Sequence, residues 1–351
     1  MRAPDYTTYE EALEMLEPYG AETKGGFSNH GPMAAEAMCS MGRGDAVRDW
    51  VHQYRKILSP RVNGHRRIEE AHWRDALGHF NRIGDWTAYF DNELAEKPWA
   101  EVLDRWLERL APGFAAAAAH GVIRTGHAVR ALTDADTPAR RRELADGLAY
   151  WAASFILLPG HHSRRPHGTA KPSEAIERVK LLPIWRRRWR HSLTSAMGQL
   201  NRFEPFAQTF SMVDTGADSN LFISDLSSTF ATVFLANART AFSAISFIHA
   251  VTGPVALRPM VPYVSKHSMA TALRYAWQTS AALYSRFAIS AQLADPDKAD
   301  LEGDNQMIER AIESGDEHAI KFTDACLNEY RLNPRGPYRA AAQQAIQLLS
   351  R

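Results

Sequence analysis

Apolar residues recur every three or four positions along most of the chain, which is the spacing of one face of an α-helix. The alternating pattern of a half-buried strand is scarce. Proline, glycine and aspartate separate the periodic segments. The expected helices span 7–16, 34–41, 46–57, 68–81, 85–96, 100–110, 114–132, 138–156, 221–251, 268–293, 301–314, 316–330 and 338–349. The pattern therefore predicts an all-α fold, a single large helical bundle-like domain over residues 1–351.

One segment departs from this periodicity. Residues 159–172, PGHHSRRPHGTAKP, are polar and rich in proline, glycine and histidine. Unstructured loops of this length are uncommon and are often functional. The segment is expected to be a polar loop or lid, and an independent metal site through His161, His162 and His167 is the weaker alternative.

A weak internal similarity links two parts of the chain. His127-Ala-Val is followed by Trp151 in LAYWAASF, and His249-Ala-Val is followed by Trp277 in LRYAWQTSAAL. The similarity is consistent either with two pseudo-repeated halves around a central metal site or with chance.

Composition narrows the classes of protein. The chain has 351 residues and a net charge of +1, with 41 basic and 40 acidic side chains. This balance gives no electrostatic basis for a nucleic-acid partner. Hydrophobic residues make up 45% of the chain and charged residues 23%, as in a globular protein. Cys39 and Cys326 are too few and too far apart for a disulfide scaffold, so a reducing, cytoplasmic location is expected.

No membrane association is expected either. The N-terminal sequence MRAPDYTTYEEALEML lacks the apolar core of a signal peptide. The most apolar segment, 221–251, is interrupted by Asp225, Asn237 and Arg239.

Four of the fourteen histidines occupy apolar or glycine-marked settings. They are His30, His120, His127 and His249. A buried imidazole needs partners for both ring nitrogens, because each unsatisfied polar group costs about 1–3 kcal/mol. Taken singly, each is explained by a hydrogen bond to a backbone carbonyl, whereas four such settings together indicate a shared site.

Local spacing gives two further indications. In SNHGPM, Gly31 and Pro32 are typical of a helix start, so His30 is expected on a rigid corner. His120 and His127 lie seven residues apart, on one helix face but about 10.5 Å apart along the axis. A shared ligand would need a bend at Gly121 or Gly126, and no HExxH motif is present.

Four separated motifs, in this order, resemble the questin oxidase-like family. They are GFSNHGPMAAEAM, AAHGVIRTGHAVRAL followed by GLAYWA, FIHAVTGP, and DEHAIKFTDACL. The founding members of that family act on fungal anthraquinones in Baeyer–Villiger-type ring opening. The resemblance implies an all-helical oxygenase with non-haem iron held by four histidines and a carboxylated lysine.

Transferred by motif, the implied ligands are His30, His120, His127, His249 and Lys321. His318 lies three residues before Lys321 on the same helix face, so either can be the ligand with the other beside it. Asn29 is a candidate partner for a ligand histidine. Iron(II) is the metal implied, with zinc or manganese as substitutes.

A lysine can serve as a ligand only in modified form. Burial and a nearby metal favour the neutral amine, which can add carbon dioxide to give an anionic carbamate on Lys321. Without the family resemblance, Lys321 beside Asp316, Glu317 and Asp324 is typical of a surface lysine.

Side chains next to the motifs are candidates for substrate binding. Arg124 could contact a substrate oxygen, although a salt bridge on the helix surface explains it equally well. The aromatic candidates, which simple core packing also explains, are Phe27, Trp151, Phe247, Tyr275 and Trp277.

The function expected from this resemblance is O2-dependent oxidative C–C cleavage of an aromatic polyketide or anthraquinone-like small molecule. The expected partners are that substrate and O2. One alternative is a metal-free or NADPH-assisted Baeyer–Villiger monooxygenase, although Gly42-Arg43-Gly44 lacks the rest of a dinucleotide fingerprint. A non-catalytic helical binding protein is the other.

Overall fold

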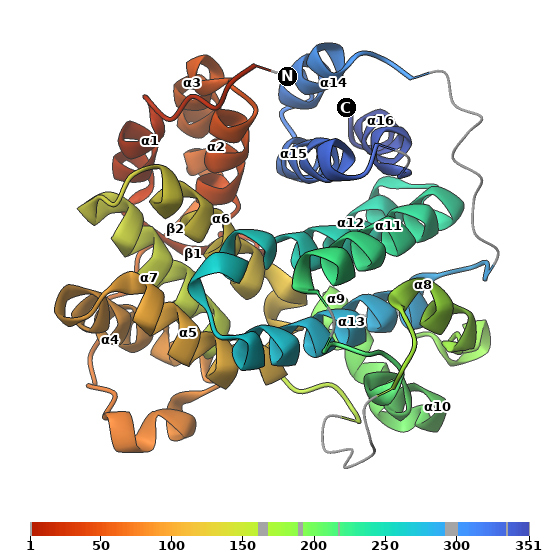
Figure 1. Cartoon of the computed structure of the whole chain (residues 1–351). Coiled ribbons are helices and arrows are strands. Elements are labelled where there is room, and N and C mark those ends of the chain that lie inside the picture. The colour runs from red at the N-terminus through yellow and green to blue at the C-terminus, as the bar shows by residue number, and fades with distance from the viewer. Residues whose placement is uncertain are drawn as a thin grey trace.

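Helices form nearly all of the regular structure, so the expected all-α class is confirmed (Figure 1). The computed structural model describes residues 2–160, 168–188, 192–216, 218–291, 301–334 and 336–350. Half of the expected segment 159–172, including His161, His162 and His167, lies outside these residues.

The first half of the chain runs from α1 to α7. Its elements are α1 Tyr9–Leu16, β1 Tyr19–Thr23, α2 Gly31–Ser40, α3 Gly44–Tyr54, η1 Arg55–Ile57, β2 Leu58–Pro60, η2 Glu70–Ala76, η3 Phe80–Arg82, α4 Ile83–Glu96, α5 Trp99–Leu110, η4 Ala111–Gly113, η5 Ala116–Ala119, α6 His120–Asp134 and α7 Pro138–Ala153, where η marks a 3₁₀ helix.

The second half begins with short helices and ends with long ones. Its elements are α8 Pro172–Ala175, η6 Ile176–Arg178, η7 Ile184–Arg186, α9 Leu193–Met197, η8 Gly198–Arg202, α10 Glu204–Ala207, η9 Thr209–Ser211, α11 Ser219–Asn237, α12 Ala241–Val255, η10 Arg258–Tyr263, α13 Lys266–Phe287, α14 Asp304–Glu313, α15 Glu317–Leu332 and α16 Tyr338–Leu349.

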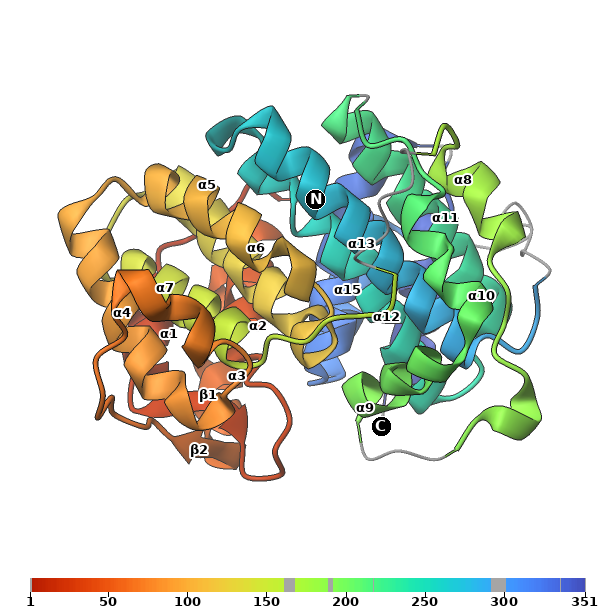
Figure 2. The same ribbon diagram turned by 90° about the horizontal axis from the view of Figure 1, so that it is seen from below.

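The two halves form opposite sides of one domain, as Figure 2 shows. Four helices meet where the halves join. Helix α2 packs against α6 and α15, and α12 packs against both α6 and α15. Segments that are distant in sequence therefore line one central space. The suggested pseudo-repeat stays a prediction.

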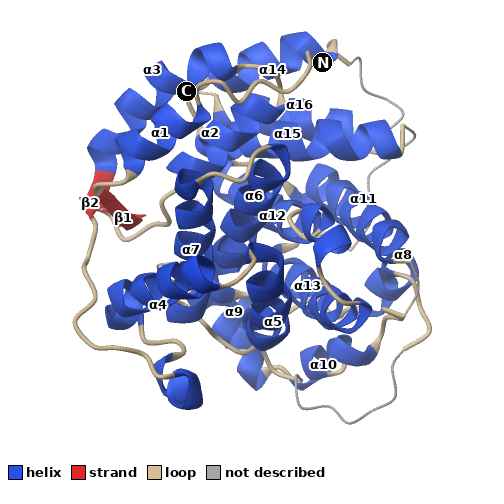
Figure 3. Cartoon of the chain, turned by 60° about the vertical axis from the view of Figure 1, so that its left-hand side comes forward, coloured by secondary structure: helices blue, strands red, loops and turns tan. Residues whose placement is uncertain are grey.

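The two strands form a small antiparallel ribbon at one edge of the molecule (Figure 3). This ribbon fixes the approach to α2. Asn29 donates its backbone N–H to the carbonyl of Ala21 and its side-chain amide to the carbonyl of Gly20. Its side-chain oxygen accepts from the N–H of Gly31. Asn29 thus anchors the start of α2. Both polar atoms of its side chain form hydrogen bonds with backbone groups, rather than with a ligand histidine.

Three expected helices differ from the structure. The segment 68–81 forms the 3₁₀ turns η2 and η3, separated at Gly78, whose φ is +71°. The segment 221–251 is divided into α11 and α12, because Thr240 caps the N–H of Ser243 and starts a new helix. The segment 114–132 becomes α-helical only from His120 onward, after the 3₁₀ turn η5.

Among the described residues, one segment is long and apolar enough to cross a membrane by length and composition. It spans Ala241–Tyr263, and 72% of its apolar window is buried in the protein. Burial of this extent is typical of a core helix. No membrane partner is therefore needed to explain its apolar character.

Candidate metal centre

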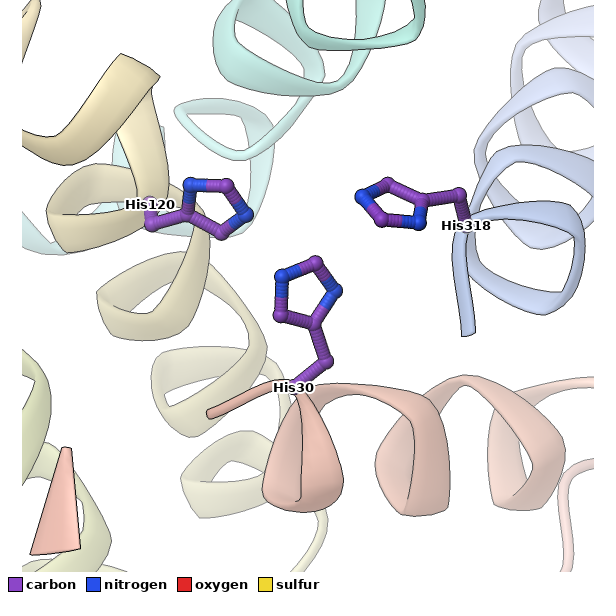
Figure 4. Close-up of side chains that lie close together, drawn as sticks. All are labelled: His30, His120 and His318. Carbon is purple, nitrogen blue, oxygen red and sulfur yellow. The ribbon is translucent and has the colours of Figure 1, made fainter. Parts of the chain in front are cut away.

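Four histidines converge from four helices at the junction of the two halves. His30 is the N-cap of α2, whose start carries Pro32 as expected, and His120 is the first residue of α6. His249 lies within α12, and His318 lies in the first turn of α15. Figure 4 shows the rings of His30, His120 and His318 pointing toward one another. Their ligand atoms all lie within 4.8 Å of one another.

The ring contacts extend to the fourth histidine. Ring centroids are 4.5 Å apart for His30 with His120, 4.5 Å for His30 with His318, and 4.6 Å for His120 with His249. The exposed fractions of His30, His120, His249 and His318 are 3%, 6%, 2% and 9%. These four residues, called the histidine cluster below, are therefore almost closed to solvent.

Two of these imidazoles have their tautomers fixed by the backbone. His120 Nδ1 lies 2.5 Å from the carbonyl oxygen of Ala117, and His249 Nδ1 lies 2.6 Å from that of Ile245. A carbonyl oxygen only accepts, so both Nδ1 atoms carry the proton. The two Nε2 atoms face each other at 3.1 Å. In neutral rings each presents a lone pair, so the pair needs a cation between or beside them.

Protonation of one of these imidazoles is unfavourable. Burial lowers the pKa of His30, His120 and His249 well below its ordinary value, and the positive charge of Lys321 lowers it further. Neutral imidazole is the form that binds metal.

The other two cluster histidines also have unused nitrogens. The Nδ1 atoms of His30 and His318 are buried, and no described residue is a hydrogen-bond partner for either. Unpaired buried polar atoms are costly, and a ligand that recruits them removes the penalty. The donor set, buried imidazole nitrogens, suits a divalent first-row metal.

Lys321 lies one helical turn after His318 and is buried, with 3% of its surface exposed. Its description as a surface lysine is therefore wrong. Burial lowers the pKa of Lys321 to about 8, against the opposing effect of Glu317 and Asp316. A minority of the amine, roughly a fifth, is therefore neutral near physiological pH.

The structure does not bring His127 into the histidine cluster. Helix α6 runs unbroken from His120, so the seven-residue separation is not closed by a bend. His127 Nδ1 instead donates to Glu36 at 2.6 Å. Arg130 also binds Glu36, and it bridges to Asp324 at 2.6 Å.

Glu36, His127 and Asp324 lie close enough to form a second possible metal group. Arg130 already supplies the cation there. Burial opposes ionisation of Glu36, but Arg130 and His127 hold its pKa at about 2. The sequence analysis missed Glu36, although an acidic residue within the apolar run AAEAM was a usable signal.

Arg124 forms the expected salt bridge, but inside the protein rather than on the helix surface. It is buried, with Nε 2.6 Å and Nη2 2.7 Å from the Glu143 carboxylate and Nη2 3.3 Å from Asp146. Its donors are thereby engaged by internal carboxylates.

Most of the aromatic candidates pack in the core. Trp151 and Trp277 are fully buried and donate their indole N–H to the carbonyls of Gly113 and Thr209. Phe247 is fully buried, and Tyr275 borders a cavity of about 700 Å³. Phe27 is 65% exposed and remains accessible to a ligand.

An unusual backbone turn precedes His120. Ala117, Ala118 and Ala119 have φ of 46°, 58° and 71°. This left-handed turn aims the Ala117 carbonyl at His120 Nδ1, and it costs L-residues about 1–2 kcal/mol each. Strain of this kind is often stored at functional sites.

Ala118→Gly is expected to raise the free energy of unfolding by about 1 kcal/mol, because glycine adopts positive φ without the steric penalty. Urea unfolding measures the change. Ala116→Gly is the matched control, since Ala116 is not among the residues with positive φ and glycine there should destabilise by about 0.5–1 kcal/mol. Equal losses in both variants would show that the turn is unstrained.

The metal-free protein is expected to lose stability as the pH falls below about 6.5. Folding lowers the pKa of His30, His120 and His249. Below this pH the unfolded chain therefore binds more protons than the folded chain, which favours unfolding. Each group contributes up to about 1.4 kcal/mol per pH unit. Urea unfolding between about pH 7.5 and 5 measures the slope, which His249→Phe should reduce. A flat profile would contradict neutral histidines.

Comparison with known proteins adds an independent observation. The model of the family described as questin oxidase-like matches residues 27–326. This range contains every residue of the histidine cluster, as well as Lys321. No curated protein matches the chain.

Proposed function

The chain belongs to the questin oxidase-like family, and from this premise we propose that it is a non-haem iron oxygenase. Family membership indicates an oxidoreductase. The proposed reaction is O2-dependent oxidative cleavage of a carbon–carbon bond in an aromatic polyketide or anthraquinone-like small molecule. The two facing Nε2 atoms of His120 and His249 carry the proposal, because their lone pairs require a cation.

The proposed ligands are His30, His120, His249 and His318, together with Lys321. The fourth histidine is thus His318, since His127 is bound to Glu36. When bound, iron(II) would supply the electron transfer to O2 that amino-acid side chains do not provide. Zinc or manganese could occupy the same donors without the same chemistry.

Lys321 contributes as a carbamate in this proposal. Its pKa of about 8 leaves a neutral amine whose nitrogen can bond to the carbon of CO2, with release of one proton. The product is an anionic oxygen donor that offsets part of the metal's charge.

The remaining protein groups bind, orient and exclude water. Near-complete burial of the histidine cluster removes competing water and strengthens the local electrostatic interactions. The carbonyls of Ala117 and Ile245 hold two rings in the metal-binding tautomer. Phe27, three residues before His30, is the proposed contact for a planar aromatic substrate.

Elemental analysis of anaerobically purified protein tests the proposal. We expect about one iron per chain after reconstitution with Fe(II), and O2 consumption when a hydroxylated anthraquinone is added. Turnover without metal would support the metal-free or NADPH-assisted alternative. Absence of both metal and turnover would support a binding protein.

A further inference from the structure

Glu317, in the first turn of α15, places its carboxylate beside two cluster histidines. Glu317 Oε1 lies 4.0 Å from His30 Nδ1 and 3.8 Å from His318 Nδ1. Both nitrogens are buried, and within the described part of the chain neither has a hydrogen-bond partner. The Glu317 side chain is 25% exposed, so it reaches the cluster from the surface.

His30 and His318 differ from the other two cluster histidines in the hydrogen bonding of their Nδ1 atoms. His120 and His249 each donate Nδ1–H to a backbone carbonyl, which leaves Nε2 unprotonated. Among the residues that the structure describes, no carbonyl accepts from Nδ1 of His30 or His318. Their tautomers are therefore not set by the backbone, although a metal site requires one unprotonated nitrogen from each ring.

The neighbouring carboxylate is already engaged. Asp316 Oδ1 lies 3.6 Å from His318 Nδ1, but it caps α15 by accepting the backbone N–H groups of His318 and Ala319 at 2.8 and 3.1 Å. Glu317 is the carboxylate that approaches both unpaired Nδ1 atoms. Both distances are about 1 Å longer than a hydrogen bond, so the carboxylate has to move closer to accept from these nitrogens.

We infer that Glu317 is the positioning residue that fixes His30 and His318 as Nδ1–H tautomers and so directs their Nε2 atoms to the metal. This inference rests on the proposed metal centre. A carboxylate that accepts from a ligand imidazole orients the ring and raises its basicity, and losing such a partner typically weakens metal binding about 10–100-fold.

Metal affinity tests the inference without requiring turnover. Metal-free protein is titrated with Co(II) against a chromophoric chelator, for the wild type and for Glu317→Ala and Glu317→Gln. Glutamine retains an oxygen that can accept from Nδ1–H, whereas alanine does not. Glu313→Gln is the matched control, because Glu313 is an exposed glutamate at the end of α14.

We expect Glu317→Ala to weaken Co(II) binding about 10–100-fold, and Glu317→Gln to recover most of it. The Glu313 variant should match the wild type. Proton NMR of the Co(II) form should show exchangeable, paramagnetically shifted imidazole N–H signals, two of which broaden or vanish in the alanine variant.

Each other outcome has a distinct meaning. Unchanged affinity in Glu317→Ala overturns the positioning role while leaving the metal centre intact. Equal losses in both Glu317 variants also overturn it, because they would make the charged carboxylate itself the ligand. A wild-type protein that binds no Co(II), zinc or iron would instead overturn the proposed function.

Discussion

His249→Ala is expected to abolish stable metal binding and, with it, O2-dependent turnover. His249 Nε2 faces His120 Nε2 at 3.1 Å, so removing the His249 ring eliminates one of two donors that share this position. Loss of a direct ligand should exceed the roughly 10–100-fold effect of losing a group that only supports one. Elemental analysis after dialysis against a chelator measures the metal retained, and an O2 electrode measures turnover.

His127→Ala is the matched control for this prediction. Both residues are motif histidines on core helices, but His127 is bound to Glu36. Its removal should leave the metal in place and cost about 1.5–3 kcal/mol of stability, the range for a hydrogen bond to a charged group. Arg130 continues to pair with Glu36, so the carboxylate is not left alone.

The opposite pattern would contradict the proposed ligand set. If folded His127→Ala protein lost its metal while His249→Ala kept it, the donors would lie in the second group, with Glu36 and Asp324. Circular dichroism of both variants excludes misfolding as the reason for a loss.

Lys321→Ala is expected to lower turnover by at least about 100-fold, because it removes the anionic oxygen donor that complements the four imidazoles. Part of the activity should return with added formate or acetate. Lys321 borders a cavity of about 30 Å³, and its truncation enlarges that space for a small carboxylate. Exposed Lys266, at the start of α13, gives the control variant Lys266→Ala.

The carbamate itself has a pH signature. Because the pKa of Lys321 is about 8, each pH unit below this value reduces the neutral amine about tenfold. Activation of metal-free protein by bicarbonate and Fe(II) should therefore slow progressively as the pH falls below about 8. Full activity of Lys321→Ala without any added carboxylate would refute the carbamate role.

Much of the fold follows from local pattern alone. Helical periodicity predicted the class and most helix positions, since burying one face of each segment leaves few alternatives. Pro32 and Gly31 located the start of α2, because their backbone preferences act over a few residues. The division of 221–251 was missed, although Thr240 with Ser243 carried a capping signal.

The left-handed turn before His120 could not be predicted in this way. Five alanines in succession strongly favour a right-handed helix, yet three residues there adopt positive φ. Tertiary packing overrides the propensity of this segment. At the start of α6, Gly121 packs directly against Trp151. A Cβ atom at Gly121 would lie within 2.8 Å of Trp151 atoms, so this close contact holds the start of α6 in place.

The sequence by itself determined the helices and the motif histidines, because periodicity, turn chemistry and residue type are local properties. The resemblance placed His127 among the implied ligands and left His318 only as the alternative to Lys321. His127 has an apolar sequence context like those of His30, His120 and His249. In the structure, however, α2 brings Glu36 to His127, and α15 brings His318 to His30. Only the tertiary structure shows which of these side chains lie together. Which donors can share a cation depends on how separate helices pack, and contacts between groups on different helices are not encoded by the spacing along one helix.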